Sequence, residues 1–196
     1  MEQGIIVAST AAVAGVKCRQ AANGAVYDQS GKAIPLHDAK LEALADLVEE
    51  LSGSPVLVLY EFDHDRERIQ KSLGACEVLG GGLSPARLDS IIKRFNAGNI
   101  PVLLGHPASM GHGLNLQRSC RHIIWFGITW NFEHYDQAIA RIYRQGQESD
   151  RVFVYLIIAT ETLDEKVVKV LVQKDRTQSD LNEALSVCGN EAISGT

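Results

Sequence analysis

The chain has 196 residues and a mass of 21.4 kDa, which suits one globular domain with at most a small appendage. Hydrophobic residues make up 45% and charged residues 22%, close to average usage, which argues against disorder, collagen and coiled coil. The 19 basic and 24 acidic residues give a net charge of −5. This balance argues against bulk electrostatic binding of nucleic acid, although it is compatible with a local basic face.

The start of the chain predicts no membrane attachment. The mildly apolar run 5–16 follows only Glu2, whereas a signal peptide has basic charge before its apolar run. The run is also too short and too rich in Ala, Ser and Thr to span a bilayer. Four cysteines match no zinc or redox spacing, so we expect reduced thiols, mostly buried, and no metal site: Cys18, Cys76, Cys120 and Cys188.

The first region, residues 1–36, is expected to be a helical and connecting segment. An Ala-rich stretch with helical character precedes QAANGAVYD, and turns are marked by Asn23-Gly24 and by Ser30-Gly31-Lys32. A lobe is expected over residues 37–176. The polar tail, residues 177–196, is expected to fray.

Apolar runs alternate with helical periods over residues 37–176. Five short runs are candidate strands: 56–60, 76–79, 101–105, 122–126 and 152–158. Most are continuously apolar, which is typical of strands buried on both faces of a parallel sheet. Three apolar stripes predict helices over 41–51, 88–95 and 163–171, and Ser84-Pro85 marks the start of the second. The alternation predicts a doubly wound α/β fold with a mainly parallel central sheet.

Glycine-rich loops follow three of these strands: Gly80–Gly82, His106–Leu116 and Gly127–Asn131. Ligands of open parallel sheets bind beyond the carboxyl ends of the strands, and glycines allow close backbone approach there. The tight turns alone also explain glycines, but three such loops at one edge favour a ligand site.

The helix expected after Asn131 supplies the strongest local pattern. At 100° per residue, Gln137, Arg141 and Arg144 fall within about 60° of one another. We expect this helix to continue to a C-cap glycine at Gly146. Arginine binds phosphate oxygens with a planar fork and stays charged, so an arginine near a helix end beside glycine loops suits a phosphate.

These residues also resemble a known family, the Swi/Snf-like ATPases of helicase superfamily 2. The segment 137–147, QAIARIYRQGQ, resembles the last motif of that family, of the form QAxxRxxRxGQ, and 111–116, GHGLNL, resembles the motif before it. Further similar positions are Val56–Phe62, Phe95-Asn96, Trp130-Asn131 and Thr162–Lys166. The resemblance covers residues 40–175 in the family's order, and 20–28 with 106–117 look similar to its phage and prophage branch.

The resemblance implies the second of two RecA-like lobes, with a three-layer α/β fold and ATP bound between the lobes. Arg144 would be the arginine finger, Arg141 its partner, and Gln137 would orient the site. The nucleotide would be contacted by Gly111, Gly113, Asn115 and Gln147. Double-stranded DNA would be contacted by His106, Ser109, Gly81, Trp130 and Asn131. The chain has His106-Pro107-Ala108 where many relatives have Ser-Thr-Arg, so Ser109, Asn115 and backbone amides would replace those contacts.

The chain has no P-loop. Its only Gly-Lys pair, Gly31-Lys32, has Val26 in place of the first glycine and Ala33 in place of the hydroxyl residue. ATP and Mg²⁺ would therefore be held mainly by an N-terminal P-loop lobe, and this chain alone is predicted to be inactive. The expected enzyme is an ATP-dependent DNA translocase or helicase in the cytoplasm of a bacterial or phage-infected cell.

Several alternatives remain open from the sequence. The chain could be a lobe of an RNA helicase, or a free-standing adaptor for nucleic acid or protein. His106 and His112 could be a metal pair, but no Cys or acidic partner is near them, so turn or polar-contact roles are favoured. Core packing is expected for Trp125, whereas Trp130 could stack on bases or pack in the core.

Overall fold

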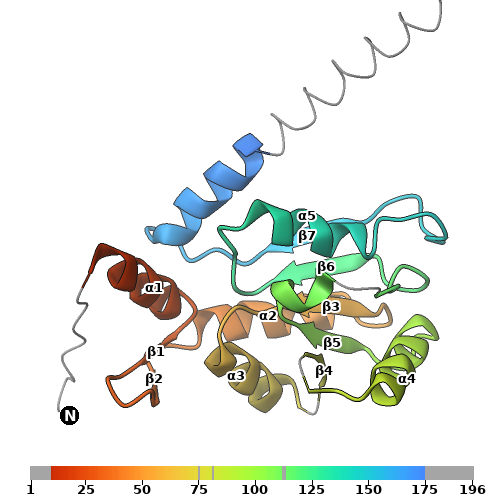
Figure 1. Ribbon diagram of the computed structural model, residues 1–196, viewed down its shortest axis with the longest axis horizontal. Helices are drawn as coiled ribbons and strands as arrows, with labels where there is room; N and C mark the ends of the chain where they lie inside the picture. Colours follow the sequence, from red (N-terminus) through yellow and green to blue (C-terminus); the bar gives the residue numbers. More distant parts are fainter. Residues whose placement is uncertain (1–9, 75, 81, 112–113, 175–196) are drawn as a thin grey trace, which may run out of the picture.

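The computed structural model describes residues 10–74, 76–80, 82–111 and 114–174. Its centre is a parallel sheet of five strands in the order β4-β5-β3-β6-β7 (Figure 1). The strands are β3 (Val56–Leu59), β4 (Glu77–Leu79), β5 (Val102–Gly105), β6 (His122–Trp125) and β7 (Phe153–Leu156). All five strands expected from the apolar runs are present, each somewhat shorter than its run.

The apolar runs are continuous because both faces of the sheet are buried. On the central strand β3, Leu57 and Leu59 enter one core cluster, while Val56 and Val58 enter the other. Since successive strand residues point to opposite faces, a strand covered on both sides has no polar positions to alternate with. The sheet edge β7 is less covered, and its Phe153 is 42% exposed.

Helices cover both faces of the sheet, which gives three layers. The helices are α1 (Ala11–Ala22), α2 (Ala39–Glu50), α3 (Asp63–Leu73), α4 (Pro85–Asn96), the 3₁₀ turn η1 (Pro107–Gly111), α5 (Phe132–Ala140) and a last helix described over 163–174. Side chains of α2 and α3 complete one core, and those of α4, η1, α5 and 163–174 complete the other. The predicted RecA-like α/β fold is confirmed. In the described part of the chain, no helix is long and apolar enough to cross a membrane.

Helix α3 was not expected from the sequence. Its eleven residues, DHDRERIQKSL, are mostly charged, and within them only Ile69 is a fully buried hydrophobic side chain. The helix start is fixed by Asp65, whose Oδ2 accepts the backbone N–H of Phe62 at 3.0 Å. A carboxylate that satisfies free N–H groups at a helix start stabilises it locally. A capping contact and one anchor thus replace the apolar stripe on which sequence prediction depends.

Residues 10–36 form α1 and a hairpin of β1 (Ala25–Tyr27) and β2 (Ala33–Pro35). The Ala-rich helix and both turns agree with the sequence, while the two short strands were not anticipated. At the first turn, Gly24 has φ +95°, and a Cβ there would lie 2.2 Å from the His37 carbonyl oxygen. Only glycine fits this turn, which brings the hairpin against the start of α2.

A buried lysine joins this N-terminal segment to the lobe. The Lys40 Nζ lies 2.5 Å from Asp164 Oδ2 and donates to Asn23 Oδ1 at 2.9 Å and to the Phe126 carbonyl at 3.2 Å. The Lys40 and Asp164 side chains are each 3% exposed. Burial lowers the pKa of Lys40, and the adjacent Asp164 carboxylate opposes that shift.

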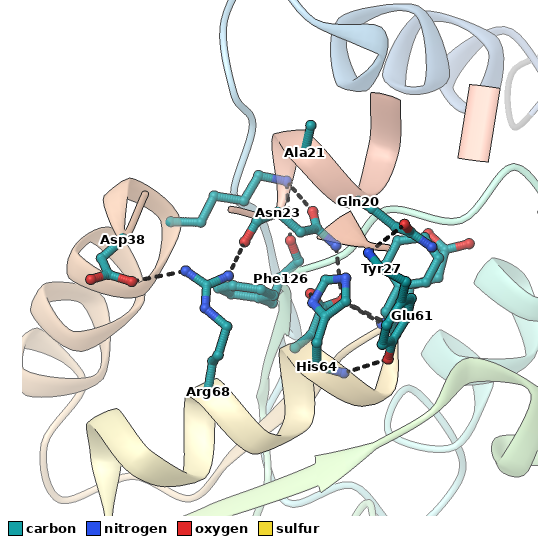
Figure 2. A network of polar contacts seen from close by, with 12 residues as sticks. Gln20, Ala21, Asn23, Tyr27, Asp38, Glu61, His64, Arg68 and Phe126 are labelled. Carbon is teal, nitrogen blue, oxygen red and sulfur yellow. Dashed lines mark hydrogen bonds and ion pairs between the residues drawn. The ribbon is translucent and has the colours of Figure 1, made fainter. Parts of the chain in front are cut away.

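The same network continues from Asn23 to α3 (Figure 2). The Asn23 Nδ2 donates to Asp65 Oδ2 at 2.9 Å, and Arg68 donates to the Asn23 carbonyl at 2.7 Å. Arg68 also bonds the His37 carbonyl and Asp38 Oδ1. The side chain and the backbone of Asn23 are therefore both hydrogen-bonded, and these bonds hold residues 10–37 against α2 and α3.

Loss of the Lys40 ammonium should destabilise the chain strongly. We expect Lys40→Met to lower the free energy of unfolding by about 3–5 kcal/mol, because the Asp164 carboxylate stays buried without its counter-charge. Urea denaturation of the purified chain measures this. The matched control is Lys93→Met on the exposed face of α4, where the Lys93–Asp89 pair should contribute under about 0.5 kcal/mol. Equal effects of the two substitutions would contradict the role given to Lys40.

A second prediction concerns the ion pairs that join β4 to α4. The guanidinium groups of Arg94 and Arg87 lie 2.7 and 2.8 Å from the Glu77 carboxylate, and the hydrogen bond from Arg94 is the largest cause that lowers the pKa of Glu77. A carboxyl with a lowered folded-state pKa stabilises the fold above its unfolded pKa and loses that effect as the pH falls through its folded pKa. Glu77→Gln should therefore cost about 1 kcal/mol or less at pH 7, since both arginines are half exposed.

The stability difference between wild type and Glu77→Gln should narrow as the pH falls below 4.5, the usual value for this carboxyl. Urea denaturation across pH 7 to 3 measures it. In an Arg87→Leu, Arg94→Leu background, Glu77→Gln should have little effect at any pH. A difference that widens toward acid would overturn the assignment.

Candidate functional site

The carboxyl ends of the parallel strands meet two adjoining hollows on one edge of the sheet. The larger, of about 600 Å³, lies beyond β3, β4 and β5, and the smaller, of about 300 Å³, lies beyond β3 and β6. Glu61 and His106 line both hollows, so the two are neighbours on this edge. This is the edge at which open parallel sheets bind ligands.

The smaller hollow gathers three of the residues expected to contact DNA: His106, Trp130 and Asn131. Trp130 is 40% exposed, whereas Trp125 is fully buried in the core, as expected for it. Asn131 caps α5, since its Oδ1 accepts the N–H groups of Glu133 and His134 at 3.0 and 3.3 Å. Asn131 thereby fixes the start of α5 beside the exposed indole.

The N-terminal helix also reaches this hollow. The Arg19 guanidinium lies 2.5 Å from the Glu61 carboxylate and 5.7 Å from the centre of the Phe62 ring. Burial raises the pKa of Glu61, and the attraction of Arg19 opposes that rise. Neither Arg19 nor Glu61 was expected from the sequence, because the two are 42 residues apart and belong to no shared motif.

The larger hollow has an acidic character. Its lining includes the carboxylates of Glu61, Asp63 and Glu67, opposed by Arg66. Ser109 reaches its rim from η1, and the backbone N–H of Ser109 donates to the His106 carbonyl at 2.8 Å. Because like charges repel, the centre of this hollow does not suit a phosphate backbone.

Two of the residues predicted for the nucleotide site meet at a second place, where the segment after η1 lies beside the segment after α5. The Arg144 Nη1 donates to Asn115 Oδ1 at 3.0 Å, and the Arg144 side chain is exposed. Arg141 is half-buried, and its Nε donates to the Met110 carbonyl at 2.8 Å. The Gln137 Nε2 instead donates to Glu133 Oε1 within α5. The structure thus brings Arg144 to Asn115 and directs Arg141 toward η1.

The expectation that the helix runs on to Gly146 is wrong. Helix α5 ends at Ala140 with Arg141 as its C-cap, and residues 141–147 form turns. The Arg141 carbonyl accepts the N–H of Leu116 at 3.3 Å, so tertiary pairing replaces a further helical turn. Gly146 has φ +95°, in the left-handed region that glycine adopts readily, but it lies within these turns. Gln137, Arg141 and Arg144 were expected on one face of a continuous helix. Because α5 ends before Arg141, they do not share a helical face.

The side chain of Gln147 is hydrogen-bonded to the backbone of its own lobe. Its Nε2 donates to the carbonyls of Cys120 and Ile142 at 2.8 and 3.2 Å, and its Oε1 accepts the N–H of Ser149 at 3.1 Å. These bonds hold the end of the turns that contain Arg144. Of the other predicted residues, Gly111 ends η1, while Gly81 and Gly113 lie outside the described residues, as does His112.

Among the described residues, no group of three or more His, Cys, Asp or Glu side chains is arranged to hold a metal ion. The buried thiol of Cys120 donates to the His122 carbonyl, and burial raises the pKa of that thiol to about 12. Cys120 therefore remains protonated and packs as a small apolar residue.

Comparison with known proteins agrees with this geometry. The family described as the helicase conserved C-terminal domain matches residues 39–146. The chain is 40% identical over 185 residues to putative protein p41 of Acyrthosiphon pisum secondary endosymbiont phage 1, covering 92% of this chain and 39% of p41. It is 28% identical over 162 residues to the DNA repair and recombination protein RAD54B of Gallus gallus, covering 76% of this chain and 17% of that protein.

A solved structure has a similar fold. The crystal structure of the C-terminal part of the Fun30 ATPase domain aligns with a TM-score of 0.59 at 23% identity, covering 67% of this chain and 44% of that one. The chain thus spans less than half the length of each of these proteins. The match over residues 39–146, together with these relatives, shows that the chain belongs to the helicase conserved C-terminal domain family and is a Swi/Snf-like lobe of helicase superfamily 2.

Proposed function

We propose that this chain is the second lobe of an ATP-driven translocase on double-stranded DNA and that Arg144 is its arginine finger. The contact between Arg144 and Asn115 is the observation that supports this proposal most directly. It joins the two segments that resemble the last two motifs of the family. It also presents an exposed guanidinium from a turn whose ends are hydrogen-bonded to the lobe.

The chemistry of a finger explains why Arg144 needs this support. In phosphoryl transfer, charge develops on the oxygens of the γ-phosphate, and a guanidinium held close by stabilises it at little reorganisation cost. Asn115 accepts one N–H of Arg144 and so restricts the orientation of its planar fork. Gly111 and Gly113 would bring backbone N–H groups near the same phosphates, on either side of His112.

Arg141 and Gln137 have supporting roles in this proposal. Arg141 is tied to η1 through the Met110 carbonyl, so a shift of η1 would be transmitted to the turn that holds Arg144. Gln137 lies one helical turn earlier, paired with Glu133, and would orient groups at the edge of the nucleotide site. Gln147 acts by holding the turn rather than by touching the nucleotide.

ATP and its Mg²⁺ would be held mainly by a P-loop lobe, since this chain has no P-loop sequence. The reaction is hydrolysis: water attacks the γ-phosphorus, the bond to the bridging oxygen of ADP breaks, and inorganic phosphate leaves. Closing of the two lobes would bring Arg144 to the γ-phosphate, and phosphate release would open them. This cycle moves the protein along a duplex and does not require strand separation.

The DNA contacts are proposed at the smaller hollow. Trp130 offers an exposed aromatic face, and His106 and Asn131 offer short polar groups beside it. Ser109, at the rim of the larger hollow, and backbone amides at Gly81 would add contacts that are independent of sequence. With a net charge of −5, the chain alone should bind duplex weakly.

Removing the finger should abolish hydrolysis and leave nucleotide binding intact. In the protein that contains both lobes, we expect Arg144→Ala to reduce DNA-stimulated ATP hydrolysis by about 10³-fold or more. Binding of a fluorescent ATP analogue should change little, because the P-loop lobe supplies most ground-state contacts. Arg118→Ala is the matched control, since its side chain is 76% exposed and lies on the neighbouring turn. Hydrolysis that survives Arg144→Ala would overturn the assignment.

The nature of the nucleic acid can be tested at Trp130. Trp130→Ala should lower the stimulation of hydrolysis by duplex DNA roughly tenfold, by removing about 1–3 kcal/mol of stacking or apolar contact. Hydrolysis without DNA should be unaffected. The assay uses duplex DNA and duplex RNA in parallel at fixed salt. Stronger stimulation by RNA would contradict a DNA translocase and favour an RNA helicase lobe.

A further inference from the structure

The last residue of α4 lies against the segment that holds Asn115. The Asn96 Nδ2 donates to the Asn115 carbonyl at 2.7 Å, and the Asn96 Oδ1 accepts the backbone N–H of Arg118 at 3.2 Å. Beside them, Ser119 Oγ donates to the Phe95 carbonyl at 2.7 Å. The end of α4 thus binds residues 115–119 at three points.

The other side of the same segment meets the turns that contain Arg144. Asn115 accepts from Arg144 through its side chain, and Leu116 donates its N–H to the Arg141 carbonyl. Residues 115–119 therefore lie between the end of α4 and residues 141–147. Any displacement of Asn115 on the α4 side changes the position of the oxygen that orients Arg144.

The Asn96 backbone is itself well fixed. Its neighbour Phe95 is fully buried in the main core, and Ile91, one turn earlier in α4, is 1% exposed. The Asn96 side chain bridges the Asn115 carbonyl and the Arg118 N–H, which are three residues apart in the sequence. This bridge requires one hydrogen-bond donor and one acceptor on a short side chain. Asparagine has both groups, whereas aspartate lacks the donor and alanine lacks both.

We propose that Asn96 is a positioning residue for the arginine finger: it fixes Asn115, and Asn115 orients Arg144. This inference rests on the proposed function, because it assigns Asn96 a role in hydrolysis through Arg144. Loss of Asn96 leaves the core and the contacts of ATP with the P-loop lobe in place but lets residues 115–119 move. Since a misplacement of about 1 Å in a reacting group can cost about a hundredfold in rate, the effect belongs to kcat rather than to KM.

The structural half of the proposal can be tested on this chain without any nucleotide. Amide hydrogen exchange is measured by NMR for wild type and three variants: Asn96→Ala, Asn96→Asp and Asn99→Ala. The Arg118 amide should exchange roughly tenfold faster in Asn96→Ala, because its acceptor is gone. Asn96→Asp keeps that acceptor and should keep the protection. Exposed Asn99 follows α4 closely, and Asn99→Ala should leave the Arg118 amide unchanged. Equal exchange in wild type and Asn96→Ala would overturn the proposal.

The functional half uses the protein that contains both lobes. Asn96→Ala should lower kcat for ATP hydrolysis about 10–100-fold, with KM for ATP within about twofold of wild type. Asn96→Asp should also lower kcat, because it cannot donate to the Asn115 carbonyl. Asn99→Ala should match wild type. A normal kcat in Asn96→Ala, with hydrolysis abolished in Arg144→Ala, overturns the positioning role and leaves the finger intact.

The two proposals fail in different ways. If Arg144→Ala hydrolyses ATP normally, the finger assignment fails whatever Asn96 does. If Asn96→Ala lowers the unfolding midpoint in urea and also raises KM, its role is general stability, and the positioning proposal is overturned. Because Asn96→Asp keeps the Arg118 bond, it tests the Asn115 bond even where the alanine variant folds poorly.

Discussion

The buried Lys40 ammonium is the contact on which the arrangement of this lobe depends. It bonds groups from three distant parts of the chain: the turn after α1, the end of β6, and the start of the helix at 163–174. A buried charge is tolerated only when its partners are in place. The three segments must therefore all reach their folded positions for Lys40 to be buried. The apolar cores supply most of the stability, and Lys40 joins segments at the edge of the sheet where the candidate site lies.

The lobe has two separate candidate functional regions. One is the hollow near Trp130, which is bordered by the N-terminal helix through Arg19. The other is the contact of Arg144 with Asn115, which is supported by α4 through Asn96 and by Gln147. The two regions share η1, since His106 precedes it and Arg141 bonds the Met110 carbonyl at its end. η1 is therefore the structural link between the proposed DNA contacts and the proposed finger.

The sequence predicted the sheet well, because continuous apolar runs such as 56–60 and 122–126 have few interpretations other than buried parallel strands. It failed where tertiary contacts replace local patterns. Helix α3 has almost no apolar stripe, and α5 stops at Ala140 because Leu116 pairs with the Arg141 carbonyl. At the site, motif resemblance assigned both Arg144 and Asn115 to the nucleotide, and the structure adds that the two side chains are hydrogen-bonded. Arg19 and Glu61 could not be found in this way, because only the folded chain brings them together.

The contacts of Asn23 show that the folded unit extends further toward the N-terminus than the region matched by the family. The family match begins at residue 39, after both α1 and the hairpin. A fragment cut at that point would keep Lys40, Asp65 and Arg68 but would lose the Asn23 amide and carbonyl that these side chains bond. It would also leave the Glu61 carboxylate, whose charge is already disfavoured by burial, without Arg19. Recombinant forms of this lobe should therefore begin before α1.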